Sequence, residues 1–342
     1  MWPSDAVSDV LILRALGLGD FLTAVPAYRG LRRAFPDASI TLAAPAVLEP
    51  LAALIRAIDR VLPVNGLGEL SAMSPPPDLA VNLHGAGPQS IEDLLATGAR
   101  WLLTHRHPQY PDIAGPGWCE EMHEVERWSR LLVLEGIPAD PTELRLAKPN
   151  QSPGIRHAVI VHPGAKAPAR RWPISRFGTV ARTLARAGHP VCITGSASER
   201  DRCLAVARSA GLGIDCVMAG DLDLGGLAAL VADARLVISG DTGIAHLASA
   251  YATPSVVLFG PTSPGRWGPP ANAPSTVIWR GVTGDPHGRR VDPALLDIGT
   301  DEVLAAAEAR LQPYRKVVTN NIGSARNRVV RDHLAGKTSP PA

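Results

Sequence analysis

Short runs of apolar residues recur along the chain, and each is followed by a stretch with the spacing of a helix. Residues 10–13 form the first such run. In the helical stretch behind it, apolar positions recur every three residues between Leu22 and Leu31, and Pro36 ends it. Continuous apolar runs of this length are typical of strands buried on both faces, and their alternation with helices predicts a parallel sheet. We therefore expect an α/β fold with strands at 10–13, 39–43, 79–83, 101–103, 158–161, 191–194, 215–218, 236–239 and 255–259.

The strands divide into two series at residues 148–154, KPNQSPG, which combine polar residues with two prolines and a glycine. A chain of 342 residues is long enough for two domains. We expect an N-terminal Rossmann-like domain over 1–150, a C-terminal one over 155–315, and a tail over 316–342 with a disordered end. When two such domains face each other across a cleft, ligands bind beyond the carboxyl ends of the strands, so the residues that follow each strand are the candidates for a site.

The charge balance excludes one large class of partner. The 34 lysines and arginines against 32 aspartates and glutamates give a net charge of +2, and aromatic residues make up only 4% of the chain. A protein that binds nucleic acid through its backbone needs a basic stripe, and one that binds single strands needs stacking aromatics. We therefore expect no nucleic-acid partner.

The cysteines and the N-terminus indicate a compartment. Cys119, Cys192, Cys203 and Cys216 form no C-x-x-C pair and no zinc-ligand spacing, which favours reduced thiols in the cytoplasm. The first residues, MWPSDAVSDVLIL, carry two aspartates and no basic segment, and no apolar run approaches about 18 residues. We expect neither a secretion signal nor a membrane span, while peripheral contact with a membrane stays open.

The loop behind the first apolar run contains Gly17, Gly19 and Asp20. The dinucleotide fingerprint G-x-G-x-x-G requires a glycine where Leu22 stands, and no acidic residue follows the second run to hold a ribose. A nicotinamide cofactor is therefore not expected. What remains is a tight turn that places Asp20 at the start of a helix inside the cleft, either as a carboxylate facing a ligand or only as the N-cap of that helix.

A basic loop follows the first strand of the second series. Lys166, Arg170 and Arg171 lie close together in it. Three such cations make a clamp for a diphosphate, since arginine binds in bidentate fashion and lysine acts as a mobile point charge. The alternative is a basic loop that is only solvated. We expect Trp172 to pack beneath this loop.

Residues 239–248, SGDTGIAHLA, have the pattern of a strand, a turn and a helix N-terminus. Unpaired amides and the positive end of the helix dipole bind phosphate at such a point. Asp241 does not suit direct contact with phosphate, so it either caps the helix or accepts a hydroxyl from a neighbouring sugar. His246 lies one turn further on, where it either faces the same ligand or packs in the core.

These segments together resemble a known family. The stretches GLGDFLTAVPAYRGLRRAFP, HPGAKAPARRWP, ITGSASE and SGDTGIAHLASAYATPSVVLFGPTSPGRWGP are similar to motifs of glycosyltransferase family 9, the ADP-heptose:lipopolysaccharide heptosyltransferases, over about residues 10 to 311. The resemblance implies the GT-B fold, with an acceptor-binding N-terminal domain and a donor-binding C-terminal domain. It also implies inverting sugar transfer from a nucleotide-sugar donor, with no cofactor and no metal.

The resemblance assigns roles to individual residues. Asp20 would be the general base that takes the proton from the acceptor hydroxyl. The residues that bind the donor would be Arg170 at the diphosphate, Glu199 at the ribose, Leu222 at the adenine, Asp241 at the sugar, and Thr242 and Gly243 at the phosphates. Lys166 and His246 are further donor-binding candidates because of their positions in the basic loop and in the helix behind Asp241. Four residues of the N-terminal domain are weaker candidates for contact with the acceptor: His84, Gln89, His123 and Arg127.

Several alternatives stay open at this point. ADP-heptose is the expected donor, with another nucleoside-diphosphate hexose as the alternative, and the acceptor is a glycolipid core or a soluble glycosylated natural product. A catalytically silent, two-lobed nucleotide-sugar-binding protein is the alternative from a different class, although a pure binder has no need of Asp20. Asp221 and Asp223 have the spelling of a metal-binding D-x-D motif, but one of these acids precedes an apolar helix and is expected to cap it.

Overall fold

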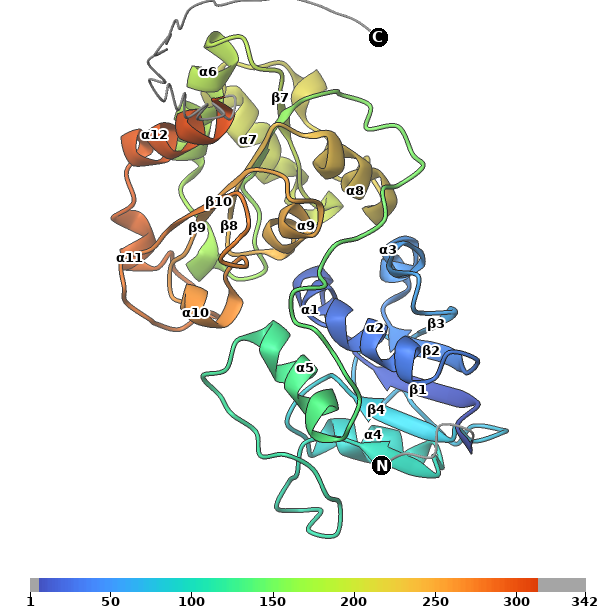
Figure 1. Ribbon diagram of the computed structural model, residues 1–342. Helices are drawn as coiled ribbons and strands as arrows, with labels where there is room; N and C mark the ends of the chain where they lie inside the picture. Colours follow the sequence, from blue (N-terminus) through green and yellow to red (C-terminus); the bar gives the residue numbers. More distant parts are fainter. Residues whose placement is uncertain (1–5, 313–342) are drawn as a thin grey trace, which may run out of the picture. The chain divides into compact units, whose positions relative to one another are not determined.

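Two parallel five-stranded sheets form the framework of the protein (Figure 1). The computed structural model describes residues 6–312, and the chain through Leu311 clusters as one compact unit. The strand order is β3-β2-β1-β4-β5 in the first sheet and β10-β9-β8-β6-β7 in the second, and all neighbouring strands are parallel. The predicted α/β class is confirmed. We call residues 6–134 the N-lobe and residues 159–311 the C-lobe.

The N-lobe follows the predicted alternation with two differences. The single helix expected behind the first strand is two helices, α1 and α2, because Pro26 at the start of α2 has no amide hydrogen to continue α1. Strand β3 was not predicted, since it lies at the sheet edge and its four residues are half-buried or exposed. The elements are β1 (Asp9–Leu13), α1 (Leu18–Thr23), α2 (Val25–Ala34), β2 (Ser39–Ala44), α3 (Glu49–Ile55), β3 (Arg60–Pro63), β4 (Leu79–Asn82), α4 (Gln89–Ala96), β5 (Trp101–Leu103) and α5 (Glu124–Leu134).

The C-lobe repeats the pattern around a second sheet. Its elements are β6 (Val159–His162), α6 (Ile174–Arg186), β7 (Val191–Ile193), α7 (Arg200–Ala210), α8 (Leu224–Asp233), β8 (Leu236–Gly240), α9 (Gly243–Tyr251), β9 (Ser255–Leu258), α10 (Pro264–Trp267), β10 (Ser275–Ile278), α11 (Pro293–Leu296) and α12 (Thr300–Leu311). Trp172 is fully buried, donates from Nε1 to the carbonyl of Ile298 at 3.1 Å and meets Phe177 edge-on, as expected for packing beneath the basic loop.

One predicted strand of the C-lobe is wrong. Residues 215–218 do not form a strand: Ile214–Cys216 is a single 3₁₀ turn, and Val217 pairs with Ile193 only in an isolated bridge. A strand at 215–218 would have to pair with β7, but β7 is only three residues long and ends at Ile193. Strand β10 was missed for the same reason as β3, because it is an edge strand without a continuous buried run.

The segment between the lobes, residues 135–158, contains no helix or strand. It is nevertheless tied to both lobes, because the amide of Ala147 donates to Leu54 at the end of α3 at 3.1 Å and the amide of Leu146 donates to Ala250 in α9 at 3.2 Å. The predicted linker at 148–154 directly follows these two residues. The domain limits stay predictions. The tail from 316 onward lies outside the described residues. Within residues 6–312, no helix is both long and apolar enough to cross a membrane.

Candidate functional site

Asp20 lies in the first turn of α1, directly behind the central strand β1. The N-cap of this helix is Gly17, and no side chain caps it, so Asp20 does not serve as the N-cap. Its carbonyl accepts hydrogen bonds from Arg14 Nε at 2.6 Å and from Thr23 Oγ1 at 2.8 Å. Among the described residues its carboxylate has no hydrogen-bond or ion-pair partner. The side chain is therefore free to contact a ligand.

Arg170 and Asp241 come together at the carboxyl edge of the second sheet. The strands that precede them, β6 and β8, are neighbours. Arg170 Nη1 lies 3.3 Å from the carbonyl oxygen of Asp241 and 3.7 Å from its Oδ2. Burial raises the pKa of the Asp241 carboxyl, and the guanidinium of Arg170 opposes that rise. The Nε of Arg170 is buried without a partner in residues 6–312, so this guanidinium retains a donor for an additional anion.

The N-terminus of α9 lies directly behind Asp241. Thr242 is its N-cap, and no side chain bonds to the first amides of the helix. Such an open N-terminus offers amide hydrogens and the positive end of the helix dipole to a phosphate. A side chain at Gly243 would not fit, because its Cβ would lie 2.8 Å from the Cβ of Leu18 in α1. The predicted strand, turn and helix N-terminus are therefore present, α1 reaches close to them, and phosphate binding stays a prediction.

His246 connects this end of α9 with Asp20. A Cβ added to Gly19 would lie 3.1 Å from Cδ2 of His246, and one small space is lined by both Thr23 and His246. Burial lowers the pKa of His246 to about 4, although the nearby Asp20 counteracts this effect. His246 is therefore a neutral imidazole. Asp20 also acts electrostatically on Asp241, so the predicted base lies near the predicted donor site.

The three predicted cations of the basic loop have different surroundings. Arg170 is the one beside Asp241. Arg171 folds back on its own loop, donating to the carbonyls of Ala165 at 2.8 Å and Lys166 at 3.3 Å. The ammonium of Lys166 is exposed and has no partner in the described part of the chain. Arg170 and Lys166 are thus the two cations available to a ligand.

Glu199 and Leu222 occupy loops on the β7 side of the sheet. The Oε2 of Glu199 accepts hydrogen bonds from the amide of Ser196 at 2.8 Å and from its hydroxyl at 2.9 Å. The same carboxylate lies against the backbone of Gly164, so a side chain at that position would displace it. It therefore sits beside the loop that begins behind β6. Leu222 is half-buried just before α8, and the nucleoside contacts of both residues stay predictions.

The two acids of the D-x-D sequence are both engaged with the protein. Asp223 Oδ1 accepts from the amide of Gly226 at 2.7 Å, which confirms the expected cap of α8. Asp221 Oδ1 lies 2.9 Å from Nη1 of Arg200. Over residues 6–312, no group of three or more His, Cys, Asp or Glu side chains has an arrangement that could hold a metal ion.

Two of the predicted acceptor residues are open to a ligand. His84 follows β4, and its Nδ1 is buried without a partner in the described chain. Burial, followed by the charge of Arg14, lowers the pKa of His84, while Asp20 is near enough to oppose that shift. Gln89 begins α4 and is exposed. His84 is therefore an acceptor candidate within electrostatic reach of the predicted base.

The other two have structural roles in this structure. His123 caps α5, since its Nδ1 accepts from the amide of Val125 at 3.2 Å, and its Nε2 then donates to the carbonyl of Gly268 at 3.0 Å. Arg127 is 1% exposed, and it donates to Glu124 Oε1 and to the carbonyls of Cys119, Glu120 and Met122. Arg127 offers no accessible donor to an acceptor.

Sequence reasoning missed Arg14, which holds the Asp20 turn from beneath and is fully buried. The available signal was a charged residue that directly continues an apolar strand just before the glycine-rich loop.

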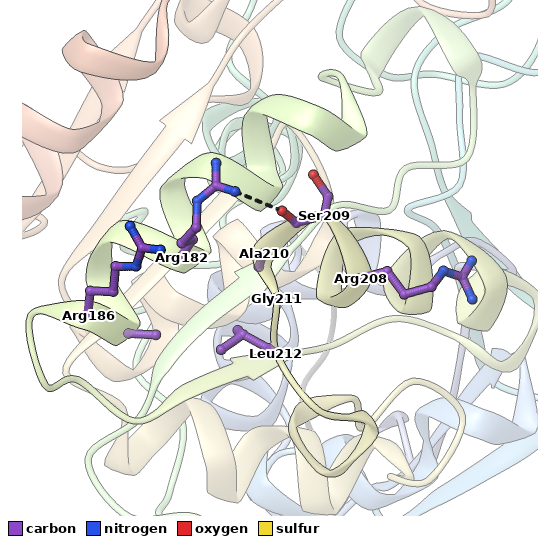
Figure 2. A pocket seen from close by; sticks show the side chains of 8 residues that line it. Arg182, Arg186, Arg208, Ser209, Ala210, Gly211 and Leu212 are labelled. Carbon is purple, nitrogen blue, oxygen red and sulfur yellow. Dashed lines mark hydrogen bonds between the residues drawn. The ribbon is translucent and has the colours of Figure 1, made fainter.

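A separate hollow of about 490 Å³ lies where α6 and α7 end, away from all of these residues (Figure 2). Arg182, Arg186 and Arg208 line it, but Figure 2 shows Arg208 extending away from the other two. Arg186 and Arg208 lie in the last turns of their helices, where the helix dipole alone favours a cation, and Arg182 donates to the carbonyl of Ser209 at 3.2 Å. The carbonyl ends of two helices also disfavour a bound anion. These features do not indicate a ligand site in the hollow.

Comparison with known proteins identifies the family. Residues 122–294, just over half of the chain, match the family described as Glycosyltransferase family 9 (heptosyltransferase). The chain belongs to glycosyltransferase family 9. The predicted membership is confirmed, and it supports transferase activity with a nucleotide-sugar donor and an acceptor. No curated protein matches the sequence of this family 9 protein.

Solved structures show the fold of the family 9 protein. A glycosyltransferase family 9 protein from Veillonella parvula matches with a TM-score of 0.72 and 20% identity, covering 89% of this chain and 97% of that one. The ADP-heptose lps heptosyltransferase II of E. coli matches with a TM-score of 0.71 and 22% identity over 89% and 98%. The E. coli heptosyltransferase WaaC with ADP gives a TM-score of 0.63 and 19% identity over 88% and 99%. The fold is GT-B, with two Rossmann-like domains.

Proposed function

We propose that this protein is an inverting, metal-independent heptosyltransferase that moves a heptose from ADP-heptose to an acceptor hydroxyl. The acceptor is a glycolipid core or a soluble glycosylated natural product. The observation that carries the proposal is the proximity of Asp20 on α1 to the Arg170–Asp241 pair and the open N-terminus of α9. The Asp20 carboxylate, which has no partner among the described residues, lies close to hydrogen-bond donors that suit a diphosphate.

The proposed reaction is a single displacement. The acceptor oxygen forms a bond to the anomeric carbon while the bond from that carbon to the diphosphate oxygen breaks. Asp20 takes the acceptor proton, and ADP leaves with the bonding electron pair. Attack from the face opposite the diphosphate inverts the anomeric configuration. General base catalysis of this kind contributes about 10²- to 10⁴-fold to the rate.

The leaving group needs stabilisation, because negative charge develops on the diphosphate in the transition state. The unused donor of Arg170, the exposed ammonium of Lys166 and the amides at the start of α9, Thr242 and Gly243, supply it. These are fixed or tethered protein groups, so the proposal requires no metal ion for this step.

The remaining donor residues would orient the sugar and the nucleoside. Asp241 is held beside Arg170 and accepts hydroxyls of the sugar, and the neutral imidazole of His246 exchanges a hydrogen bond with the same sugar. Glu199 accepts from the ribose hydroxyls and Leu222 packs against the adenine. The E. coli structures are named for ADP-heptose and for ADP, which supports an ADP-activated heptose as the first donor to test.

A donor screen tests this function. The protein is incubated with ADP-heptose and with ADP-, UDP- and dTDP-hexoses, together with lipid-core oligosaccharides or soluble glycosides, and products are identified by mass spectrometry. We expect consumption of ADP-heptose, release of ADP and a gain of one heptose on the acceptor. The Asp20→Asn variant, which should still bind ADP, is the control.

Two outcomes would contradict the proposal. Consumption of a hexose donor in place of ADP-heptose would indicate a hexosyltransferase on the same fold. Tight binding of a nucleotide sugar without transfer to any acceptor, or to water, would indicate a silent binding protein.

A further inference from the structure

The chain has an arginine at position 14, where the pattern of a buried strand predicts an apolar residue. It directly follows β1 and is fully buried. Removing a guanidinium from water costs several kcal/mol unless its donors are satisfied, and apolar residues of similar volume are often at least as stable in such places. The contacts of Arg14 therefore indicate what this cation is retained for.

The guanidinium forms a closed set of hydrogen bonds with the Asp20 turn. Its Nε donates to the carbonyl of Asp20 at 2.6 Å, and its Nη2 donates to Thr23 Oγ1 at 3.0 Å. The hydroxyl of Thr23 in turn donates to the same Asp20 carbonyl at 2.8 Å. The third nitrogen, Nη1, donates to the carbonyl of Leu83, the residue before His84. One side chain thus joins the loops behind β1 and β4.

The Asp20 carbonyl is free for these bonds because α1 ends early. The amide of Ala24, which would bond to this carbonyl in a continuous helix, lies instead 3.3 Å from the carbonyl of Phe21. A helix of six residues with no side-chain cap is not stable by itself. The turn that carries Asp20 is therefore held by the hydrogen bonds from Arg14 and Thr23 together with the buried side chains of Phe21 and Leu22.

Arg14 holds the main chain of Asp20 and does not pair with its carboxylate. Its charge is balanced elsewhere, by Glu124 Oε2 at 3.8 Å and by the ring of Trp128, whose centroid lies 4.7 Å from the guanidinium carbon. A direct ion pair would lower the proton affinity of a carboxylate and weaken it as a base. The observed arrangement fixes the position of residue 20 without occupying its side-chain oxygens.

We propose that Arg14, with Thr23, is a positioning residue for the catalytic carboxylate of Asp20. Its hydrogen bonds fix the position of the first turn of α1 relative to the sheet. Its bond to Leu83 fixes the position of the loop that carries His84. This inference rests on the proposed role of Asp20 as the base. It predicts that loss of the Arg14 fork lowers the rate of the chemical step and leaves donor binding, which belongs to the C-lobe, unchanged.

The test compares Arg14→Lys, Thr23→Val and Thr23→Ser with wild type. Lysine keeps the charge but cannot reach all three acceptors, whereas serine keeps the hydroxyl that valine removes. Arg29→Lys is the matched control, because Arg29 lies in the same lobe and also donates to main-chain carbonyls, those of Glu143 and Arg145 in the segment between the lobes. Release of ADP from ADP-heptose, with the lipid-core oligosaccharides or soluble glycosides of the donor screen as acceptors, gives kcat and KM, and hydrogen exchange reports on the amides of residues 18–24.

We expect Arg14→Lys to lower kcat by about 10- to 100-fold, with KM for ADP-heptose within about twofold of wild type. Exchange of the α1 amides should rise by about tenfold while the C-lobe amides keep their rates. Thr23→Val should show the same pattern to a smaller extent, Thr23→Ser should restore wild-type behaviour, and Arg29→Lys should leave both readouts unchanged.

Three results would overturn the inference. Faster exchange in α1 with an unchanged kcat would show that the turn needs no such support for catalysis. A raised KM at constant kcat would assign Arg14 to substrate binding, and faster exchange throughout the N-lobe would make it a general scaffold residue. If wild type released no ADP from ADP-heptose, the proposed function would fail, and the exchange data alone would still decide whether Arg14 holds α1.

Discussion

Replacing Arg170 by alanine should weaken the binding of ADP without abolishing the fold of the C-lobe. Arg170 bonds to Asp241 only through Nη1, and its Nε has no partner among the described residues, so most of its donors remain available to a diphosphate. One charged hydrogen-bonded contact is worth about 1.5–3 kcal/mol. The dissociation constant of ADP should therefore rise by about 10- to 150-fold.

Isothermal calorimetry with ADP at neutral pH measures this change. Arg170→Lys keeps the charge but loses the planar fork, so its dissociation constant should fall between those of wild type and Arg170→Ala. Arg186→Ala is the control, because this arginine lies at the end of α6 in the separate hollow. It should leave the affinity for ADP unchanged.

Loss of Arg170 could weaken ADP binding indirectly, through Asp241, as well as by loss of direct contact. Alanine at position 170 also leaves the Asp241 carboxyl buried without its cation, which would raise its pKa further and disturb the start of α9. In the Asp241→Asn background this indirect effect is absent. Arg170→Ala should still weaken ADP binding there by most of the original factor. If the loss vanishes in that background, or if Arg170→Ala binds ADP like wild type, Arg170 does not contact the diphosphate.

Three further predictions follow from the same site and from the N-lobe. Asp20→Asn should lower kcat by about 100-fold or more while calorimetry finds the affinity for ADP nearly unchanged, and near-native turnover would remove Asp20 from the mechanism. Turnover in excess EDTA should stay within about twofold of the untreated enzyme, equivalent to a barrier change of about 0.4 kcal/mol, whereas activity that magnesium or manganese must restore would refute the metal-independent step. Burial lowers the pKa of His105 to about 4, so below about pH 6.5 the unfolded chain takes up a proton that the folded protein excludes. Urea unfolding should show about 2 kcal/mol of stability lost between pH 7.5 and pH 5 from this residue, and His105→Phe should lose that much less.

The sequence was most informative where a site is built from one continuous segment. The start of α9 behind Asp241 and the cap of α8 by Asp223 were predictable, because a strand, a turn and a helix N-terminus within a few residues have a characteristic pattern. The burial of Trp172 was also predicted, although its partner Ile298 lies 126 residues further along the chain. Edge strands were missed, since β3 and β10 lack the continuous apolar run that marks a buried strand.

The contacts that depend on distant segments could not be predicted. The partners of Arg14 include Leu83 and Glu124, about 70 and 110 residues further along the chain, so nothing local shows that the buried cation supports Asp20. The same holds for His123, which the sequence offers as an acceptor residue. The fold uses it as a helix cap and as a donor to Gly268 in the other lobe.

The ties at Leu146 and Ala147 have a consequence for how the two lobes can move. If the 24 residues between α5 and β6 were unattached, they could stretch to about 80 Å and the lobes could separate. The middle of this segment is fastened to α3 on one side and to α9 on the other, so the segment is a fixed joint and not a free tether. Labels placed beside residue 147 should therefore keep their distance from both helices.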